Sequence, residues 1–535
     1  MKFDYIIIGA GSAGAVLANR LSENPQIAVL LIEAGKKDKG MNIHIPAAYT
    51  KLNNSAVDWA YWSEPQKEFL NRRLFLPRGK TLGGSSSTNA MIYIRGNRLD
   101  YDKWAALGNK GWSYEDVLPY FKKSEDNQQF HNDYHGKGGG LYVGHTGYKT
   151  VLADAFIQAN QELGYPFNED VNGEVQDGVT RAQFTIKNGK RWSTAQAFIK
   201  PALSRPNLAV LTKAQVSKIL IENKKATGIE YWDTKGNKKI ILCKREVIVS
   251  AGAFNAPQLL MLSGIGDKDE LKNQGIPLVQ HLPGVGKNLH DHLFFHVASL
   301  ASQKVSFNNA ETLGNLLRYF LTKKGPFSIS PLETCSFVRT QAGLAQPDLQ
   351  LHFTPSHCGA ADYDPKLNMY DTNTFPKTEG YTILPTLLKP KSRGYVALKS
   401  NNPLDAPLIQ PDFCSDSYDK EILIRGFKIV KKLHQTEAFK PYFKEMHYPA
   451  QSNTDEEIWY HIQKTVETVY HPVGTCKMGN DEMAVVDAEL KVHGMEGLRV
   501  ADASIMPEIV SGNTNAPTIM IGEKAADLVK GVKIG

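Results

Sequence analysis

A chain of 535 residues is too long for one ordinary hydrophobic core, so we expect two or more domains. Its 42% hydrophobic and 22% charged residues are typical of a globular protein. The 62 lysines and arginines exceed the 55 acidic residues by only 7. Because the two signs are interspersed, the chain lacks the basic stripe of a nucleic-acid-binding protein. No stretch reaches the roughly 18 apolar residues of a membrane span.

The five cysteines are widely scattered, and no two of them form a CxxC pair. An odd, dispersed set argues against a disulfide framework and against a zinc site. We therefore expect a cytoplasmic protein without a structural metal.

The N-terminal segment has the order strand, glycine turn, helix, strand, acid. Apolar, β-branched runs predict buried strands at residues 3–8 and 28–32, and helical spacing predicts a helix at residues 15–21. Glu33 follows the second strand directly. All parts fall in the register of a βαβ unit, which favours a dinucleotide site over a purely structural glycine turn.

The three glycines and the glutamate of this unit each have a physical role. Gly9 permits the tight turn, and Gly11 lets the backbone approach a pyrophosphate at the positive end of the helix. Gly14 allows the helix to pack closely on the strand, and Glu33 can accept hydrogen bonds from an adenosine ribose. The motif alone does not distinguish FAD from NAD.

A second glycine-rich loop spans residues 77–91 and contains many hydroxyl groups. Such a loop can place backbone N–H groups against phosphates and a planar ring. An apolar run at residues 91–94 follows, so we expect the loop to turn inward. Residues 125–148 are polar and glycine-rich, which predicts an excursion over the surface.

The remaining elements are expected in the following order. A helix at residues 151–163 precedes short strands at 208–211, 214–221, 227–232 and 238–242, a buried strand at 246–250 and a helix at 257–263. Residues 294–457 read as a second, mixed domain with a strand at 349–353, a polar insert at 363–381 and helices at 421–433 and 455–463. A last strand at 498–503 and a helix at 519–529 end the chain.

Five long motifs carry a family resemblance: GAGSAG from Gly9, PRGKTLGGSSSTNAMIYIRG from Pro77, GAFNAPQLLMLSGIG from Gly252, HPVGTCKMG from His471, and VADASIMP with SGNTNAPTIMIGEKAADL from Val500. They resemble the glucose–methanol–choline (GMC) oxidoreductases, FAD-dependent alcohol oxidases and dehydrogenases, and among them the choline dehydrogenase-like and aliphatic alcohol dehydrogenases.

The resemblance implies an α/β (α+β overall) fold with a Rossmann-like FAD-binding domain and a substrate domain on an antiparallel sheet flanked by helices. It places the main FAD-binding part at residues 1–293, with a substrate-domain excursion at about 150–190. Residues 294–465 form the substrate domain, and residues 466–535 return to the FAD domain with the catalytic residues.

The resemblance also assigns the cofactor-binding residues. They are Gly9, Gly11, Gly14 and Glu33 for the ADP part, Val216 at the adenine, Arg78, Gly83, Gly84, Asn89 and Met91 along the pyrophosphate and flavin, Asp502 and Ala503 under the cofactor, and Asn515 and Thr518 at the flavin's pyrimidine edge.

Some relatives attach FAD covalently to a histidine in the glycine-serine loop. The matching position is Thr88, so we expect non-covalent FAD. A light-driven branch that decarboxylates fatty acids has a cysteine and an arginine where Leu388 and Gln410 align, and it lacks the His471-Pro472 pair. We therefore disfavour that activity.

His471 matches the catalytic base of the family, and Asn513 matches its partner 42 residues later. A histidine suits the removal of an alcohol proton because its pKa lies near the working pH. An asparagine cannot act as a base, but its amide can donate a hydrogen bond to the alcohol oxygen. A cluster of three histidines, His290, His292 and His296, could suggest a metal site. The segment also matches a family loop without metal, and we favour this second interpretation.

Choline-oxidising relatives carry a glutamate where this chain has Phe294. An apolar residue there favours an aliphatic or aromatic alcohol, although aromatic faces can also hold a quaternary ammonium. Residues 172–178 and 188–193 also resemble the membrane-associated aliphatic alcohol dehydrogenases of alkane-degrading bacteria.

We therefore expect oxidation of a primary, fairly apolar alcohol to the aldehyde by hydride transfer to flavin N5, with electrons passed to a quinone or another acceptor. The alternatives are a choline dehydrogenase, an alcohol oxidase that reduces O2 to H2O2, and a catalytically silent flavin protein, against which His471 and Asn513 argue. Quinone-linked relatives bind membranes peripherally, so such binding to the inner membrane is allowed, but no amphipathic anchor or lipidation motif stands out.

Overall fold

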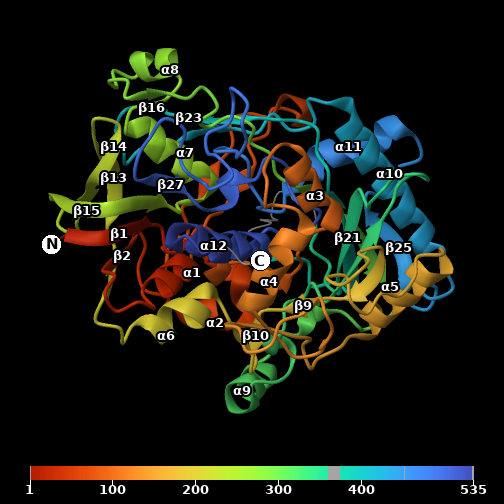
Figure 1. Cartoon of the computed structure of the whole chain (residues 1–535). Coiled ribbons are helices and arrows are strands. Elements are labelled where there is room, and N and C mark those ends of the chain that lie inside the picture. Colours follow the sequence, from red (N-terminus) through yellow and green to blue (C-terminus); the bar gives the residue numbers. More distant parts are fainter. Residues whose placement is uncertain (1, 360–373, 451, 533–535) are drawn as a thin grey trace.

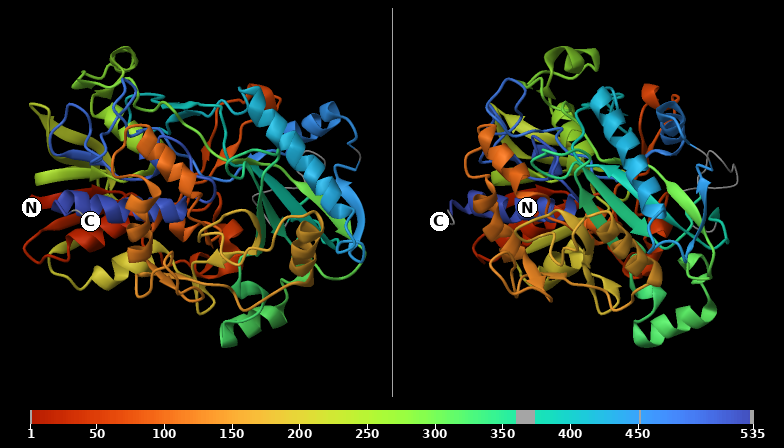
Figure 2. Two further views of the ribbon diagram at one scale, coloured as in Figure 1. Left: turned by 45° about the vertical axis from the view of Figure 1, so that its right-hand side comes forward. Right: turned by 90° about the vertical axis from the view of Figure 1, so that its right-hand side faces the viewer.

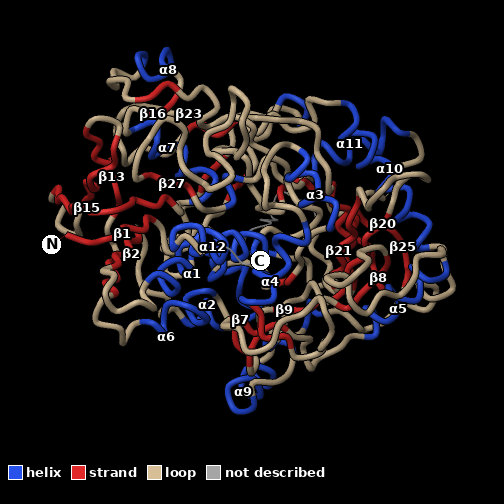
Figure 3. Tube along the Cα trace, in the orientation of Figure 1, coloured by secondary structure: helices blue, strands red, loops and turns tan. Residues whose placement is uncertain are grey.

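The computed structural model describes residues 2–359, 374–450 and 452–532. Two groups of strands lie on opposite sides of the molecule, and helices surround both (Figures 1 and 3). The expected polar insert at residues 363–381 falls largely outside the described residues, because its first part, up to residue 373, is among those left out.

The first sheet collects strands from the beginning, the middle and the end of the chain. They are β1 (Lys2–Ile8), β2 (Val29–Glu33), β12 (Leu208–Thr212), β13 (Gln215–Glu222), β14 (Lys225–Trp232), β15 (Lys238–Val249) and β27 (Leu498–Val500). The order is β12-β2-β1-β15-β14-β13, and β27 also pairs with β15. Strands β12, β2, β1, β15 and β27 are parallel, whereas β13, β14 and β15 form an antiparallel meander. This arrangement confirms the Rossmann-like sheet.

Two predicted strands, at residues 238–242 and 246–250, are one continuous strand, β15. Its first half pairs with β14, and its second half lies between β1 and β27. Charged Lys244 and Arg245 lie in the gap between the two predicted strands, but the strand crosses them because it changes partners there rather than ending.

Helix α7 (Gly252–Leu262) begins five residues before the predicted start at Pro257. A proline usually marks the first turn of a helix, because it has no N–H to donate. Here Pro257 lies inside the helix, and the carbonyl of Ala253, four residues earlier, instead accepts a hydrogen bond of 2.6 Å from Thr475 Oγ1. A side chain from the C-terminal segment thus replaces the missing helical bond.

Helices α1 (Ser12–Leu21), α4 (Tyr114–Ser124) and α12 (Asn515–Lys530) lie together next to the first sheet (Figure 1). A Cβ on Gly522 would lie 2.9 Å from Ala13 Cα, so the glycine allows α12 to approach α1 closely. The guanidinium of Arg20 pairs with the buried Glu523 carboxylate at 2.8 Å. The C-terminal helix is therefore fastened to the helix that begins at the glycine turn.

The second sheet is antiparallel, as predicted. Its strands are β8 (Gly178–Arg181), β18 (Leu293–Phe294), β19 (Val297–Ala301), β20 (Thr334–Val338), β21 (Leu349–Thr354), β22 (Gly380–Leu387), β25 (Phe443–Tyr448) and β26 (Glu467–Thr468). The order is β25-β19-β22-β21-β20-β8, with β18 pairing β22 and β26. Strand β8 comes from the expected excursion at 150–190, while the domain boundaries themselves stay a prediction.

Alternation along β21 decides which face of this sheet meets the site. Leu351 and Phe353 belong to the apolar core that includes residues of α5 (Val151–Glu162) and α10 (Ser417–His434). The residues between and after them, His352 and Thr354, line the central cavity. The helices thus cover one face, and the other face supplies side chains to the cavity.

The other helices are α2 (Met41–His44), α3 (Arg98–Ala106), α6 (Lys200–Ala202), α8 (Lys268–Asn273), α9 (Leu313–Thr322) and α11 (Asp455–Thr465). Short strand pairs are β3 (Tyr61–Trp62) with β4 (Phe75–Leu76), β5 (Ile92–Tyr93) with β9 (Gln183–Phe184), β6 (Glu125–Asn127) with β7 (Leu141–Val143), β10 (Ile186–Lys187) with β11 (Lys190–Arg191), β16 (Ile265–Gly266) with β17 (Gln280–His281), and β23 (Tyr395–Ala397) with β24 (Leu408–Gln410). Within the described ranges, no helix is both long enough and apolar enough to cross a bilayer.

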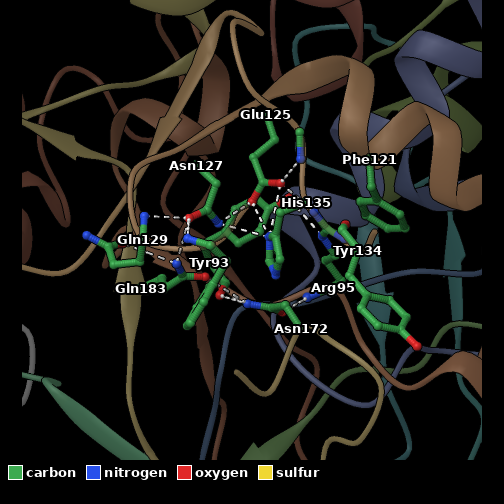
Figure 4. Close-up of polar contacts among 12 residues, drawn as sticks. Tyr93, Arg95, Phe121, Glu125, Asn127, Gln129, Tyr134, His135, Asn172 and Gln183 are labelled. Carbon is green, nitrogen blue, oxygen red and sulfur yellow. Dashed lines mark hydrogen bonds and ion pairs between the residues drawn. The ribbon is translucent and has the colours of Figure 1, made fainter. Parts of the chain in front are cut away.

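The predicted surface excursion at residues 125–148 is wrong for Glu125, Asn127 and His135, which are buried and lie together in one polar network (Figure 4). Glu125 accepts from Arg95 Nη2 at 2.6 Å and from the amide of Asn127 at 2.8 Å. His135 lies between Glu125 and Asp170, with Nε2 2.8 Å from the Asp170 carboxylate. Polar composition suggested exposure, but these groups satisfy one another inside the protein.

We expect Glu125→Gln to destabilise the protein strongly, because it leaves the buried Arg95 guanidinium without its carboxylate. Removing one partner of a buried ion pair costs about 3–5 kcal/mol. The matched control is Glu437→Gln, which breaks the exposed pair with Lys440 and should change stability little. Urea unfolding midpoints measure both, and equal shifts in the two variants would contradict the structural role of the Glu125 network.

Candidate functional site

A cavity of about 500 Å³ is lined by residues of both sheets. Its lining includes the glycine turn after β1, and it also includes His471 and Asn513. Most of the predicted site residues line it, although they come from distant parts of the chain: Gly9, Gly11, Glu33, Arg78, Gly84, Asn89, Met91, Val216, Phe294, His471, Asp502, Ala503, Asn513, Asn515 and Thr518.

The glycine turn has the geometry that its sequence predicts. Gly9 has a φ of +99°, and a Cβ there would lie 2.4 Å from the carbonyl oxygen of Ser250. A Cβ at Gly14 would lie 2.0 Å from the carbonyl oxygen of Gly9, so only glycine allows α1 to come this close to β1. A Cβ at Gly11 would meet no atom within 4 Å. The space over the N-terminus of α1 is therefore open to a ligand phosphate.

Glu33 has a second task besides the predicted contact with a ribose. Its Oε2 accepts from the backbone N–H of Ala10 at 2.9 Å, and its Oε1 accepts from that of Gly35 at 2.7 Å. Burial raises the pKa of Glu33 to about 7, against the effect of these two hydrogen bonds. Because each carboxylate oxygen has a further lone pair, the group can hold the turn and still accept from a ligand.

The loop at residues 77–91 packs directly against the glycine turn. A Cβ at Gly84 would lie 2.7 Å from Gly11 Cα. Gly83, predicted to contact the cofactor, lies behind the cavity wall, where its N–H donates to the carbonyl of Ala10 at 2.8 Å. Gly83 therefore joins the two glycine-rich segments rather than lining the cavity.

The end of this loop is held by a buried arginine that sequence reasoning missed. Asn89 Oδ1 accepts from the N–H of Met91 at 3.0 Å and from Arg191 Nη1 at 2.8 Å. Met91 has a φ of +65°, an uncommon value for a residue with a side chain. The contact between Asn89 and Arg191 spans 102 residues, so no local signal in the sequence identifies it.

The C-terminal segment closes the cavity through two side chains. Asp502 accepts from the backbone N–H of Gly252 at 2.8 Å and from that of Ser504 at 2.8 Å. Asn515 Oδ1 accepts from Ser12 Oγ at 2.7 Å. The last strand and α12 are thus tied to the first residues of α7 and α1.

His471, Asn513 and His292 form a chain of contacting side chains, of which His471 and Asn513 line the cavity. Asn513 Nδ2 lies 3.2 Å from His471 Nε2. The other ring nitrogen, His471 Nδ1, lies 3.0 Å from His292 Nδ1. His292 Nε2 lies 3.1 Å from the carbonyl oxygen of Leu388.

These distances assign the tautomers of both histidines. The carbonyl of Leu388 can only accept, so His292 carries its proton on Nε2 and its Nδ1 is an acceptor. His471 must then donate from Nδ1, which leaves the lone pair of its Nε2 directed toward Asn513 and the cavity. Sequence reasoning considered His292 only as part of a possible metal cluster, and it missed the contact with His471 because the two residues are 179 positions apart.

Both histidines are held neutral. Burial lowers the pKa of His292 to about 3. Burial, and then the nearby His292, Arg78 and His352, lower the pKa of His471 well below 6.5. A neutral imidazole with its lone pair facing the cavity can take a proton from a ligand hydroxyl.

The backbone at His471 is fixed from two sides. Its N–H donates to Asp291 Oδ1 at 2.7 Å, and the Arg78 guanidinium donates to the carbonyl of Tyr470. Burial raises the pKa of Asp291 to about 7, while Arg78 opposes that rise. The loop at 77–91 thus positions the candidate base as well as lining the cavity.

The other two histidines of the segment make separate contacts. His290 Nε2 accepts from the N–H of Ile509 at 2.8 Å, and His296 Nδ1 lies 3.3 Å from the carbonyl oxygen of Thr465. Across the described part of the chain, no group of His, Cys, Asp or Glu side chains has the arrangement of a metal site.

The surroundings of Phe294 correct the view that this part of the pocket lacks a carboxylate. Phe294 lines the cavity, and Glu467, its partner across strands β18 and β26, lines it too. The Glu467 carboxylate pairs with Arg72 at 3.1 Å. A carboxylate therefore lies beside Phe294, but an arginine already contacts it.

His352 is a further cavity residue that sequence reasoning missed. Both of its ring nitrogens are buried, and neither has a hydrogen-bond partner among the residues described. Burial lowers its pKa to about 4, so the ring is neutral. The alternation in residues 349–354, with Gln350, His352 and Thr354 on one face, is the signal that could have revealed it.

We expect Gly11→Ala and Gly14→Ala to fail in different ways. The methyl group of Gly11→Ala enters open space, so the protein should fold, but crowding a bound pyrophosphate costs about 1–3 kcal/mol, roughly 5- to 150-fold in flavin affinity. Gly14→Ala forces a methyl group against backbone and should lower the unfolding temperature itself. Flavin content and thermal unfolding of the apoproteins separate the two effects, and full flavin retention by Gly11→Ala would contradict the assignment.

We expect His292→Leu to slow substrate-driven flavin reduction about 10–100-fold, the range known for side chains that orient metal-binding imidazoles through a similar hydrogen bond. His471→Ala should lose about 10²–10⁴-fold, as for a general base. His292→Gln, whose amide oxygen can still accept from His471 Nδ1, is the matched control and should recover part of the rate. Because the pKa of His471 is lowered, the wild-type rate should stay level down to pH 6.5 and fall only at more acidic pH. An unchanged rate in His292→Leu would refute the tautomer assignment.

The N-terminal and C-terminal profiles of GMC oxidoreductases match residues 3–294 and 390–522. The alcohol dehydrogenase (acceptor) of Pseudomonas putida is 44% identical over 98% of this chain and 95% of that protein. Mitochondrial choline dehydrogenase of Mus musculus is 42% identical over 99% of this chain and 90% of that protein. The structure of pyridoxine 4-oxidase from Mesorbium loti superimposes with a TM-score of 0.90 at 30% identity, over 98% of both chains.

GMC oxidoreductases bind FAD, and the residues present fit that cofactor. The open space over Gly11, the N-terminus of α1 and the Glu33 carboxylate suit the ADP part. The cavity continues from there to His471, where a reacting ring would meet a substrate. Motifs, fold and site together show that this chain belongs to the GMC oxidoreductase family.

Proposed function

We propose that the protein oxidises a primary, fairly apolar alcohol, aliphatic or aromatic, to the aldehyde, with His471 as the base. The observation that carries this proposal is the pair of contacts on the His471 ring, where Nδ1 lies against His292 Nδ1 and Nε2 lies against Asn513 Nδ2 in the cavity. That arrangement supplies a proton acceptor and a hydrogen-bond donor side by side, which an alcohol hydroxyl requires.

In this proposal each side chain has a defined task. His471 Nε2 accepts the hydroxyl proton, and the Asn513 amide donates to the alcohol oxygen as negative charge develops there. His292 keeps the His471 proton on Nδ1, and Asp291 with Arg78 fixes the backbone around it. When bound, the flavin supplies the acceptor for the carbinol hydride.

We propose that FAD is held without a covalent bond. Thr88 lines the cavity at the position where some relatives carry a histidine, and a threonine hydroxyl does not form that linkage. The residues assigned to the cofactor line the cavity, with two exceptions. Gly83 does not line it, and Gly14 acts through the packing of α1 on β1.

Phe294 supports an apolar substrate, and Leu332 and Leu384 line the same cavity. Choline is the second candidate, because choline dehydrogenases are close relatives and because Glu467 lies beside Phe294. Arg72 neutralises that glutamate, which reduces its attraction for a quaternary ammonium. We therefore rank the apolar alcohol first.

The electron acceptor is proposed to be a quinone or another organic acceptor, since the Pseudomonas putida relative is named as acceptor-dependent. An alcohol oxidase that makes H2O2 is the alternative. We place the protein in the cytoplasm, a location that its five free cysteines support.

We expect anaerobic mixing with n-alkanols or benzyl-type alcohols to bleach the flavin of the purified holoenzyme, whereas choline and sugars should not. Phe294→Glu should lose alkanol-driven reduction and gain reduction by choline, because it adds a carboxylate to the pocket. Phe294→Leu, which keeps the apolar character, is the control and should retain the alkanol reaction. Flavin absorbance in a stopped-flow instrument follows all three proteins.

Bleaching by choline alone would overturn the apolar substrate, and no bleaching by any alcohol would overturn the activity. Admitting air afterwards distinguishes the acceptors: rapid return of the yellow colour with H2O2 formation identifies an oxidase, and slow return identifies a dehydrogenase.

A further inference from the structure

Helix α9 (Leu313–Thr322) projects from the body of the protein, at the bottom of Figure 1 and in both views of Figure 2. Thr312 caps its N-terminus by accepting from the N–H of Asn315, and Lys323 ends it in a left-handed conformation. It is attached to the body mainly through Tyr319, which is buried and whose hydroxyl donates to the carbonyl of Gly189 at 3.0 Å.

The apolar side of this helix faces solvent. Leu313, Leu317 and Leu321 are 74%, 53% and 83% exposed, and Phe320 beside them is 44% exposed. Their spacing of four residues places the three leucines in one stripe. A surface helix normally turns such a stripe toward the core, so α9 has the reverse orientation.

Basic groups border the stripe. Between residues 311 and 325 the chain has three cations, Arg318, Lys323 and Lys324, and one carboxylate, Glu311, which pairs with Lys51. Exposed Lys190 lies next to Gly189, on the hairpin that Tyr319 contacts. Leucines on one face with Lys and Arg beside them are typical of helices that lie in the interface of an anionic bilayer.

The position of α9 connects it with the cavity. Ala310 and Glu311, just before the helix, line the cavity, and so do Pro326 and Phe327, just after it. The helix is therefore an extension of the cavity wall. A surface that bound α9 would lie beside these four lining residues.

We propose that α9 docks the protein on an anionic lipid bilayer, with its leucine stripe among the acyl chains and its cations at the headgroups. Docking would bring the cavity wall next to the membrane. That arrangement would let an apolar alcohol or a quinone pass between lipid and cavity, a consequence that rests on the proposed function.

A lipid surface fits these features better than a second copy of the chain. Stable protein interfaces bury roughly 800 Å² on each partner, more than a single projecting ten-residue helix offers. The cations would repel the same cations of another copy, whereas each basic residue near anionic lipid adds roughly fivefold to binding. Long Lys and Arg side chains can also reach headgroups while the helix lies deeper.

The test is flotation of the holoenzyme with vesicles of phosphatidylcholine alone or mixed with phosphatidylglycerol. The wild type should float with the mixed vesicles, and the triple variant Leu313→Gln, Leu317→Gln, Leu321→Gln should bind at least about tenfold less. The control replaces Leu203, Leu278 and Leu404, exposed leucines elsewhere, with glutamine and should bind like the wild type. The pair Arg318→Gln, Lys324→Gln should lose the preference for phosphatidylglycerol.

Reduction of flavin by a water-soluble alcohol should be unchanged in the leucine variant, so this assay checks the proposed activity separately from docking. Failure of the wild type to float would overturn the proposal, as would equal flotation of wild type and leucine variant. A wild-type dimer that becomes monomeric in the leucine variant, by analytical ultracentrifugation, would also overturn it in favour of self-association.

Discussion

Helix α1 meets strand β1 so closely that a methyl group at Gly14 would lie 2.0 Å from the carbonyl oxygen of Gly9. This approach sets the positive end of α1 at the carboxyl edge of the parallel strands, beside the open space at Gly11. Other segments attach at the same place: Gly83 donates to Ala10, and Asn515 accepts from Ser12. The glycine turn is therefore the reference point for the second loop and for the C-terminal helix.

Burial controls the chemistry around His471. It keeps His292 and His471 neutral, and the hydrogen bond between them directs the lone pair of the candidate base. In the proposed reaction, this neutral imidazole is the acceptor for the hydroxyl proton of the alcohol.

Local patterns predicted the parts of the fold that depend on neighbouring residues. The glycine turn and the first strands follow from patterns within short segments, whereas the His471–Asn513 pair was predicted from the family resemblance and joins two motifs 42 residues apart. The predicted start of α7 was wrong because the side chain of Thr475, 222 positions after Ala253, replaces the helical hydrogen bond that Pro257 cannot make. The Glu125 network was missed for a related reason, since composition does not show whether polar groups find partners inside the protein.

The electrostatic details of the site lie beyond local patterns altogether. His292 contacts the candidate base, His471, although 179 positions separate them, and Arg72 pairs with Glu467, which lies 395 positions later. Helical spacing alone would have turned the α9 leucines inward, but the residue that α9 buries is Tyr319, which packs with Ile45 and Ala48 and donates to Gly189. Residue types can be read from a sequence, but the partners that set their charge and direction come from the folded chain.

The first sheet is completed by β27, and α1 is covered by α12, both from the last 40 residues of the chain. During synthesis, the N-terminal part of the nucleotide site therefore leaves the ribosome long before the C-terminal segments that complete the site are made. Contacts of this separation form late and slowly in folding. A flavin that binds only the finished cavity would shift the equilibrium toward the complete fold, so the supply of cofactor in the cell becomes a factor in how much of the chain matures.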